Sequence, residues 1–131
     1  MKVLLIKPGK KPEIVDIEPG LESLQKMVGG DIQVVYPFDD LVGLIVNDEG
    51  KLKGLPLNRA LRDETGEMYD IVAGNLLVAG LTEDSFDSLS DALIEKYSKF
   101  FEYPEHFIFL NGHVYSRPYT ERELKAANQE D

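Results

Sequence analysis

Four side chains in the middle of the sequence offer the most suggestive chemistry. Asn58, Arg59 and Arg62 lie close together, and Lys51 precedes them by a few residues. Arginine is scarce, with four in the whole chain, and guanidinium groups bind carboxylates and phosphates through paired hydrogen bonds. These residues are therefore candidate contacts for an anionic ligand or for a partner protein. The alternative is internal pairing with the acids that follow in the sequence, Asp63, Glu64 and Glu67.

The sequence contains no recognisable constellation for catalysis or metal binding. It has no cysteine, which excludes a thiol nucleophile, a disulfide and a thiolate metal site. His106 and His113 are the two histidines, and their spacing matches no zinc motif. The Gly-x-Ser-x-Gly elbow and the phosphate-binding glycine motifs are also missing. We therefore expect no cofactor and no metal, and favour a non-enzymatic role. An enzyme built from carboxylates and one histidine remains an open alternative.

Negative charge is concentrated in the second half of the chain. The net charge is −10, from 14 basic and 24 acidic residues. Residues 1–60 hold 8 basic and 9 acidic side chains, whereas residues 61–131 hold 6 and 15. Proteins that bind nucleic acid usually present a basic face, so direct binding to nucleic acid is not expected. The acidic half is either a solubilising surface or a docking face for a partner protein with a basic surface.

Turn residues divide the first half of the chain into short elements. Prolines fall at the edges of apolar runs, and Gly29-Gly30 ends an apolar stripe with helical spacing. The acidic turn Asn47–Gly50, with Gly50 suited to a left-handed conformation, predicts a hairpin. The expected elements are strands over 2–7 and 13–17, a helix over 20–28, and strands over 32–36, 41–46 and 52–55.

The second half predicts the longest helix and the clearest hairpin. Apolar residues over 89–101 recur at helical spacing, and Ser88 with Asp91 resembles a capping box. Asn111-Gly112 is the strongest two-residue hairpin signal in the chain. Residues 56–62 could begin a helical turn or form a strand, and Gly74 could be a bulge within one bent strand or separate two. Thr120 with Glu123 predicts a terminal helix, followed by a frayed tail over about 126–131.

These elements predict one α+β domain over residues 1–131. We expect a mainly antiparallel sheet of six to eight short strands with two or three helices, because the helices fall between runs of strands and do not alternate with them. No apolar run approaches the length of a membrane span, and no secretory signal is visible. A cytoplasmic location without membrane association is therefore expected.

Several segments resemble a family of domains of unknown function, family 3846. The most specific is the run Asn47-x-Glu49-Gly50-Lys51 to Pro56-Leu57-Asn58-Arg59. Similar segments are residues 2–8, 20–25 with 28–30, 35–40 and 70–74, and the long helix and final hairpin also look similar. The resemblance implies a setting on phages, plasmids and conjugative elements of bacteria. It implies no activity, so no catalytic residue is carried over.

Together these observations favour an accessory protein of a mobile genetic element that binds a protein and modulates it. A role against host defence, including mimicry of DNA, is one form of this hypothesis. The alternative is a binder of a small anionic ligand or nucleotide that uses Lys51, Asn58, Arg59 and Arg62. The sequence leaves homodimerisation and the identity of any partner open.

Overall fold

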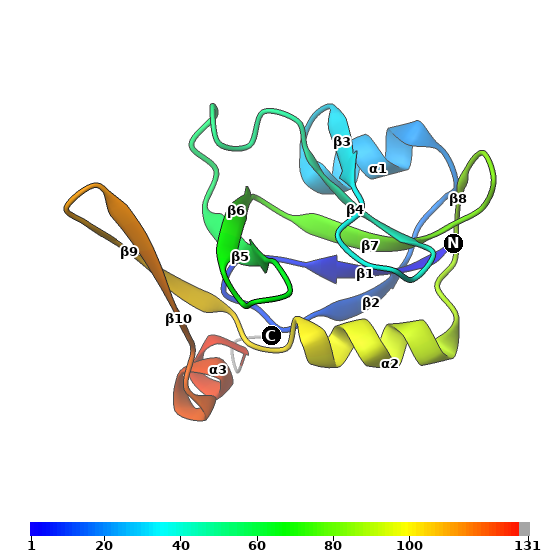
Figure 1. Cartoon of the computed structure of the whole chain (residues 1–131). Coiled ribbons are helices and arrows are strands. Elements are labelled where there is room, and N and C mark those ends of the chain that lie inside the picture. The colour runs from blue at the N-terminus through cyan, green and yellow to red at the C-terminus, as the bar shows by residue number, and fades with distance from the viewer. Residues whose placement is uncertain (129–131) are drawn as a thin grey trace.

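The computed structural model describes residues 1–128, which form ten strands and three helices (Figure 1). The α+β class and the mainly antiparallel arrangement are confirmed, with more strands than the six to eight expected. In chain order the elements are β1 (Lys2–Ile6), β2 (Glu13–Asp16), α1 (Leu21–Val28), β3 (Ile32–Val35), β4 (Val42–Asn47), β5 (Leu57–Arg62), β6 (Met68–Ala73), β7 (Leu76–Leu81), β8 (Phe86–Asp87), α2 (Asp91–Phe100), β9 (Glu105–Leu110), β10 (His113–Pro118) and α3 (Glu121–Asn128). No described helix has the length and apolar character needed to cross a membrane.

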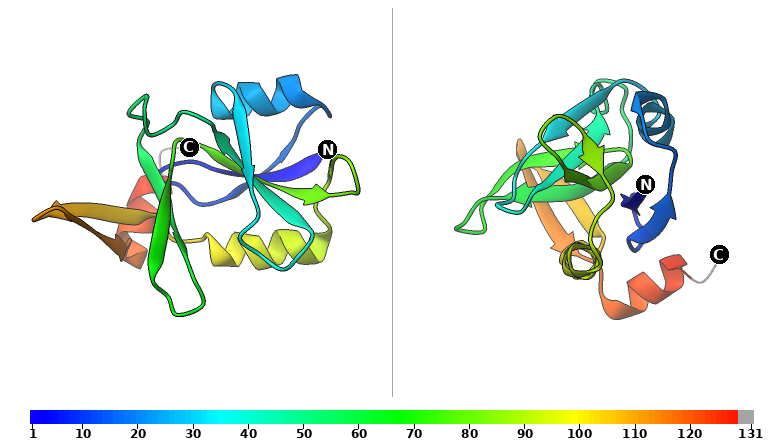
Figure 2. Two further views of the ribbon diagram at one scale, coloured as in Figure 1. Left: turned by 45° about the horizontal axis from the view of Figure 1, so that its top comes forward. Right: turned by 90° about the vertical axis from the view of Figure 1, so that its right-hand side faces the viewer.

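The main sheet has the strand order β2-β1-β7-β4-β3, and β8 pairs with the end of β7. All of these pairings are antiparallel. Strands β5 and β6 form a separate two-stranded sheet, and β9 and β10 form another. Helix α1 covers one face of the main sheet and α2 covers the other (Figures 1 and 2). The β9–β10 hairpin projects away from these layers, and we call it the arm.

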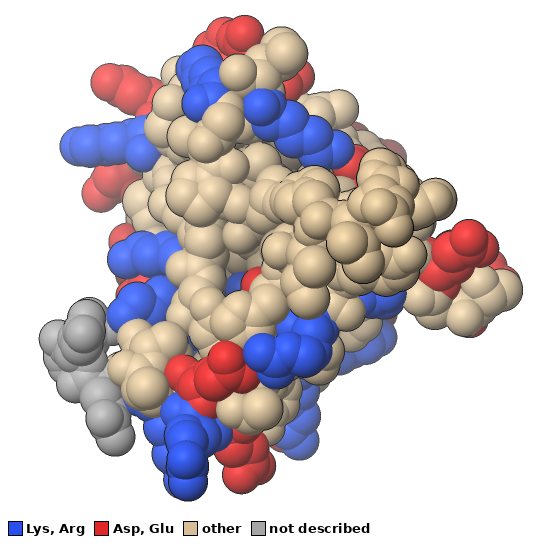
Figure 3. Space-filling view, turned by 90° about the vertical axis from the view of Figure 1, so that its left-hand side faces the viewer, with Lys and Arg blue, Asp and Glu red and all other residues tan. Residues whose placement is uncertain are grey.

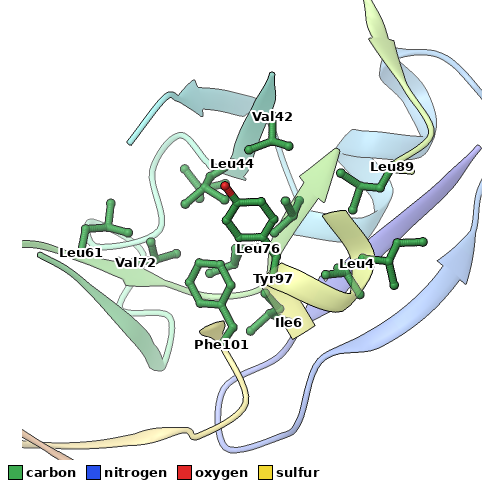
Figure 4. Close-up of a cluster of buried hydrophobic side chains, with 13 residues drawn as sticks. Leu4, Ile6, Val42, Leu44, Leu61, Val72, Leu76, Leu89, Tyr97 and Phe101 are labelled. Carbon is green, nitrogen blue, oxygen red and sulfur yellow. The ribbon is translucent and has the colours of Figure 1, made fainter. Parts of the chain in front are cut away.

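Alternation along the central strands supplies two apolar cores, one on each face of the main sheet. In β1, Val3 and Leu5 pack on the α1 side, whereas Leu4 and Ile6 pack on the α2 side. A strand that is buried on both faces reads as a continuous apolar run, which is why the period of two is invisible in this segment. The larger core contains Tyr97 and other residues from α2, and it is closed by side chains of the β5–β6 sheet (Figure 4).

Each helix is stabilised by local signals, although one differs from the expectation. Gly29 ends α1 in the left-handed conformation with φ 78°. Thr120 and Glu123 form the expected reciprocal cap of α3. The cap of α2 is Ser90, whose side chain accepts a hydrogen bond from the backbone N–H of Leu93. The prediction that Ser88 caps this helix is therefore wrong. Ser88 instead accepts a hydrogen bond from the backbone N–H of Lys2, which connects this segment to β1.

The hairpin expected between residues 41–46 and 52–55 is not formed. Residues 48–54 are a series of turns, and the strand partners of β4 are β3 and β7. Gly50 does not have a positive φ; its requirement is steric, because a Cβ there would lie 2.5 Å from the carbonyl oxygen of Ala73. The glycine therefore allows the loop to approach β6 closely, a contact between distant segments that no local pattern reveals.

Two open questions from the sequence are decided by the fold. Residues 57–62 are a strand, β5, and they pair with β6. Gly74 has a φ of 86° and separates two strands that belong to different sheets, so it is a turn and not a bulge. Of the tail expected to fray over 126–131, residues 126–128 belong to α3. Residues 129–131 lie outside the described part of the chain.

Candidate functional site

Asn58 and Arg59 lie inside the protein, where they tie four backbone segments together. Asn58 is 1% exposed, and its amide donates to the carbonyl oxygens of Ile6 and Gly74, both at 2.8 Å. Its side-chain oxygen accepts a 2.9 Å hydrogen bond from Arg59. These contacts join the end of β1 to the turn between β6 and β7. The amide group is therefore engaged within the fold as both donor and acceptor.

Arg59 is 2% exposed, and its guanidinium donates mainly to backbone carbonyls. Its Nε and Nη2 atoms lie 3.2 and 2.8 Å from the carbonyl oxygen of Phe101, which caps the end of α2. The Nη2 group also donates to the carbonyl oxygen of Lys10 at 2.8 Å. Burial lowers the pKa of Arg59 to about 10, while the nearby carboxylate of Glu105 acts in the opposite direction. The charge is thus retained at neutral pH and stabilised by neutral acceptors.

Lys51 and Arg62 are exposed, and they line different depressions of the surface. Lys51 pairs with Asp70 of β6 and borders a cavity of about 160 Å³ beside the 48–52 loop. Arg62 lies 3.5 Å from Glu105 and lines a cleft of about 440 Å³ with Arg59 and the aromatic rings of Phe38 and Phe100. The four candidate residues therefore do not converge on one site. The sequence also suggested that Arg59 and Arg62 pair with the acids that follow them in the chain. Neither arginine forms an ion pair with Asp63, Glu64 or Glu67.

The arm presents the most unusual surface of the described chain. Residues 106–116 contain no lysine, arginine, aspartate or glutamate, in a protein in which 29% of residues carry such a charge. Asn111 and Gly112 have φ values of 51° and 78°, as the expected two-residue turn requires. Four large apolar side chains of the arm are about half exposed or more, and these are Ile108, Phe109, Leu110 and Tyr115. An uncharged surface fills the centre of the view onto this end of the molecule (Figure 3).

The base of the arm is fixed to the body by side-chain contacts on both sides. The carboxylate of Glu105 accepts a 2.9 Å hydrogen bond from the backbone N–H of Ala60 in β5 and a short one from Ser116. On the other side, the ring of His106 stacks on Tyr119 at 4.3 Å and contacts Glu123 of α3 at 2.7 Å. Within the described residues, β10 has β9 as its one strand neighbour. The arm is therefore a positioned hairpin with an open edge.

An apolar groove of about 340 Å³ separates the arm from the β5–β6 sheet. Phe109 and Val114 are direct cross-strand partners, so they share the face of the arm that borders the groove. Ile108, Leu110 and Tyr115 belong to the opposite face because side chains alternate along a strand. The apolar wall across the groove consists of Leu57, Met68, Tyr69 and Ile71, and the charged pair of Lys51 and Asp70 completes the lining.

Acid is expected to release α3 from the base of the arm. The backbone N–H of Thr120, with Arg117 and His106, lowers the pKa of Glu123 to about 2 from an ordinary value of 4.5. A carboxylate whose pKa is lower in the folded state stabilises the fold above pH 4.5, and this stabilisation is lost as the pH falls from 4.5 towards 2. We expect the NMR signals of Ala126 and Ala127 to shift over this range. Glu123→Gln should show the acid-type signals at pH 6 already; unchanged signals in that variant would contradict the assignment.

The remaining titratable residues form no metal-binding arrangement within residues 1–128. No group of three or more histidine, aspartate or glutamate side chains there is placed to hold a metal ion. His106 belongs to the contact with α3, and His113 lies on the exposed arm near Tyr115. The arm was missed as a candidate site, although its signal was visible: a charge-free stretch around an Asn-Gly turn is unusual in so charged a sequence.

Comparison with known proteins matches residues 1–102 to one family model, that of the domain of unknown function DUF3846. The match covers the main sheet, α1, the β5–β6 sheet and α2. It ends before the arm and α3, so the final hairpin, which looked similar in sequence, lies outside it. No curated protein and no solved structure matches the chain.

Proposed function

Because the chain belongs to the family of domains of unknown function DUF3846, we propose its function from geometry: it is a non-enzymatic protein-binding modulator that engages its partner through the arm. The observation that carries this proposal is the charge-free apolar surface of residues 106–116 on a projecting hairpin. Contiguous exposed apolar surface on an otherwise charged protein is typical of a protein interface. Aromatic residues such as Phe109 and Tyr115 are common anchors in such interfaces.

The biological setting belongs to the same proposal. The resemblance noted in the sequence implies mobile genetic elements of bacteria, in which a small modulator would bind a host protein or a protein of the element itself. The net charge of −10 supports a partner with a basic surface, because opposite charges accelerate encounter and suppress wrong partners. The arm would supply the apolar contact, and the acidic body would orient the partner.

The proposal is tested by affinity capture from nuclease-treated host lysate with two matched variants. The double variant Phe109→Ser/Leu110→Ser removes two exposed apolar side chains from the arm. The control, Tyr36→Ser/Leu41→Ser, removes two similarly exposed apolar side chains from the body. We expect the arm variant to lose a stoichiometric partner at least tenfold, because an interface anchor contributes more than about 1.4 kcal/mol. Equal capture by wild type and both variants, or loss with the control alone, would overturn the proposal.

The second proposal, a small anionic ligand or nucleotide, has weaker support. Asn58 and Arg59 are occupied by internal hydrogen bonds, and Lys51 and Arg62 border different depressions. What favours it is the cleft that combines Arg62 with exposed aromatic surface. Thermal denaturation with a panel of nucleotides decides it, since a ligand at 100 times its dissociation constant stabilises the protein by about 2.7 kcal/mol. No shift with any nucleotide, in wild type or in Arg62→Met, would exclude this use of the cleft.

A further inference from the structure

The groove between the arm and β6 has a composition that specifies the chemistry of its occupant. Six of its eight lining residues are apolar: Leu57, Met68, Tyr69, Ile71, Phe109 and Val114. The two charged members, Lys51 and Asp70, already pair with each other. A polar metabolite would therefore find few free hydrogen-bond partners in the groove, whereas a bulky apolar side chain would replace water along its walls.

The acidic turn that directly precedes the groove residues Met68 and Tyr69 in the chain supplies the second constraint. The turn between β5 and β6 holds Asp63, Glu64 and Glu67, and the next residues in the chain, Met68 and Tyr69, line the groove. Within the described residues none of the three acids forms an ion pair. Side-chain and backbone hydrogen bonds from Thr65 and Glu67 lower the pKa of Asp63, so this acid stays ionised. In Figure 3, acidic side chains project at the margin beside the uncharged surface.

We propose that the groove receives a segment of the partner protein that carries a large apolar anchor flanked by lysine or arginine. This inference rests on the proposed protein-binding function and specifies the partner's contact. The anchor packs between Phe109 and Tyr69, and the basic side chain meets the acidic turn. A second copy of this chain is the less suitable occupant, because its own acidic turns would approach one another across a two-fold axis.

The arm offers a matched pair of variants for the test. Phe109 and Leu110 are neighbours with similar exposure, 71% and 57%, yet Phe109 borders the groove and Leu110 belongs to the opposite face. Phe109→Ser therefore removes a wall of the groove, whereas Leu110→Ser controls for general loss of apolar surface. For the charges, Glu64→Gln/Glu67→Gln removes two of the three acidic charges of the turn, and neither side chain forms a hydrogen bond or an ion pair within residues 1–128. Glu83→Gln/Asp84→Asn, between β7 and β8, is the control.

The probe is a displayed library of random 15-residue peptides, selected on the whole protein. We expect the selected peptides to combine Phe, Leu, Ile or Tyr with Lys or Arg. Their dissociation constants should rise at least tenfold with Phe109→Ser and less than twofold with Leu110→Ser. The Glu64→Gln/Glu67→Gln variant should weaken binding by about three- to tenfold at low salt, an effect that 0.5 M salt removes and that Glu83→Gln/Asp84→Asn does not reproduce.

Each contrary outcome overturns this inference separately from the proposed function. Failure to select any peptide, peptides without basic residues, or equal effects of Phe109→Ser and Leu110→Ser would each reject the groove as the site. A dimer in sedimentation experiments that Phe109→Ser abolishes would assign the groove to a second copy. If the lysate partner still depends on the arm in any of these cases, the protein-binding function stands and only the mode of recognition fails.

Discussion

Arg59→Met is expected to lower the free energy of unfolding by about 3 kcal/mol, because it leaves buried carbonyl groups without a donor. Three acceptors lose their partner: the carbonyl oxygens of Phe101 and Lys10 and the side-chain oxygen of Asn58. The variant also removes a buried charge, and this offsets part of the loss of free energy. The three acceptors nevertheless remain unpaired. Urea denaturation followed by circular dichroism measures the change. An unaltered slope of the unfolding free energy against urea concentration would show that the variant and the wild type have comparable unfolded states.

Two further variants make the interpretation of Arg59 specific. Arg59→Lys keeps the charge but not the fork of donors, so we expect a loss of about 2 kcal/mol. Arg62→Met should cost less than about 1 kcal/mol, because Arg62 forms an exposed contact with Glu105. An Arg59→Met protein as stable as the wild type would contradict the structural role. It would also revive the use of Arg59 for an anionic ligand, which the same variant would then abolish in the nucleotide assay.

Tyr97→Ala is expected to lower the free energy of unfolding by about 3–5 kcal/mol through loss of packing in the larger core. Tyr97 is 1% exposed and lies within the larger core (Figure 4). Its ring centroid lies 4.8 Å from that of Phe38. Its hydroxyl donates a 2.6 Å hydrogen bond to Asp40, which also pairs with Lys96. Burial and the charge of Asp40 raise the pKa of Tyr97, so the hydroxyl stays protonated and continues to donate at neutral pH.

The conservative variant separates packing from the hydrogen bond. Tyr97→Phe keeps the ring and should cost about 1 kcal/mol, because Asp40 retains Lys96 as a partner. Tyr36→Ala, at an exposed position, should change the stability by less than about 0.5 kcal/mol. If Tyr97→Phe destabilised as much as Tyr97→Ala, the connection from α2 to the loop before β4 would be the dominant contribution, and the packing argument would be wrong.

Local signals in the sequence predicted most of the elements. The period of α2, the glycine that ends α1, the reciprocal cap at Thr120 and Glu123, and the Asn111-Gly112 turn all act within a few residues. Such interactions are encoded where they occur, so these elements are confirmed with small shifts of their ends. The α+β class followed from the order of these elements along the chain.

Contacts between distant segments could not be predicted in this way. Residues 48–54 form a loop where a strand over 52–55 was predicted, and Gly50 within this loop packs closely against Ala73. The cap of α2 is Ser90, while Ser88 forms a hydrogen bond with Lys2 of β1. In each case a local preference was overridden by a partner far away in the sequence. The same reason explains why β5 and β6 form a sheet of their own beside the larger core.

The candidate site shows most clearly which properties depend on local sequence and which depend on long-range contacts. The sequence by itself determined that the chain is acidic, contains no cysteine and no recognisable catalytic motif, and has a charge-free segment around an Asn-Gly turn. Only the tertiary structure decided that Arg59 is a buried donor to Phe101 and Lys10, and that the arm stands apart from β6 with a groove between them. The physical reason is that burial and the convergence of side chains depend on long-range packing, whereas charge, turns and helix caps are local properties.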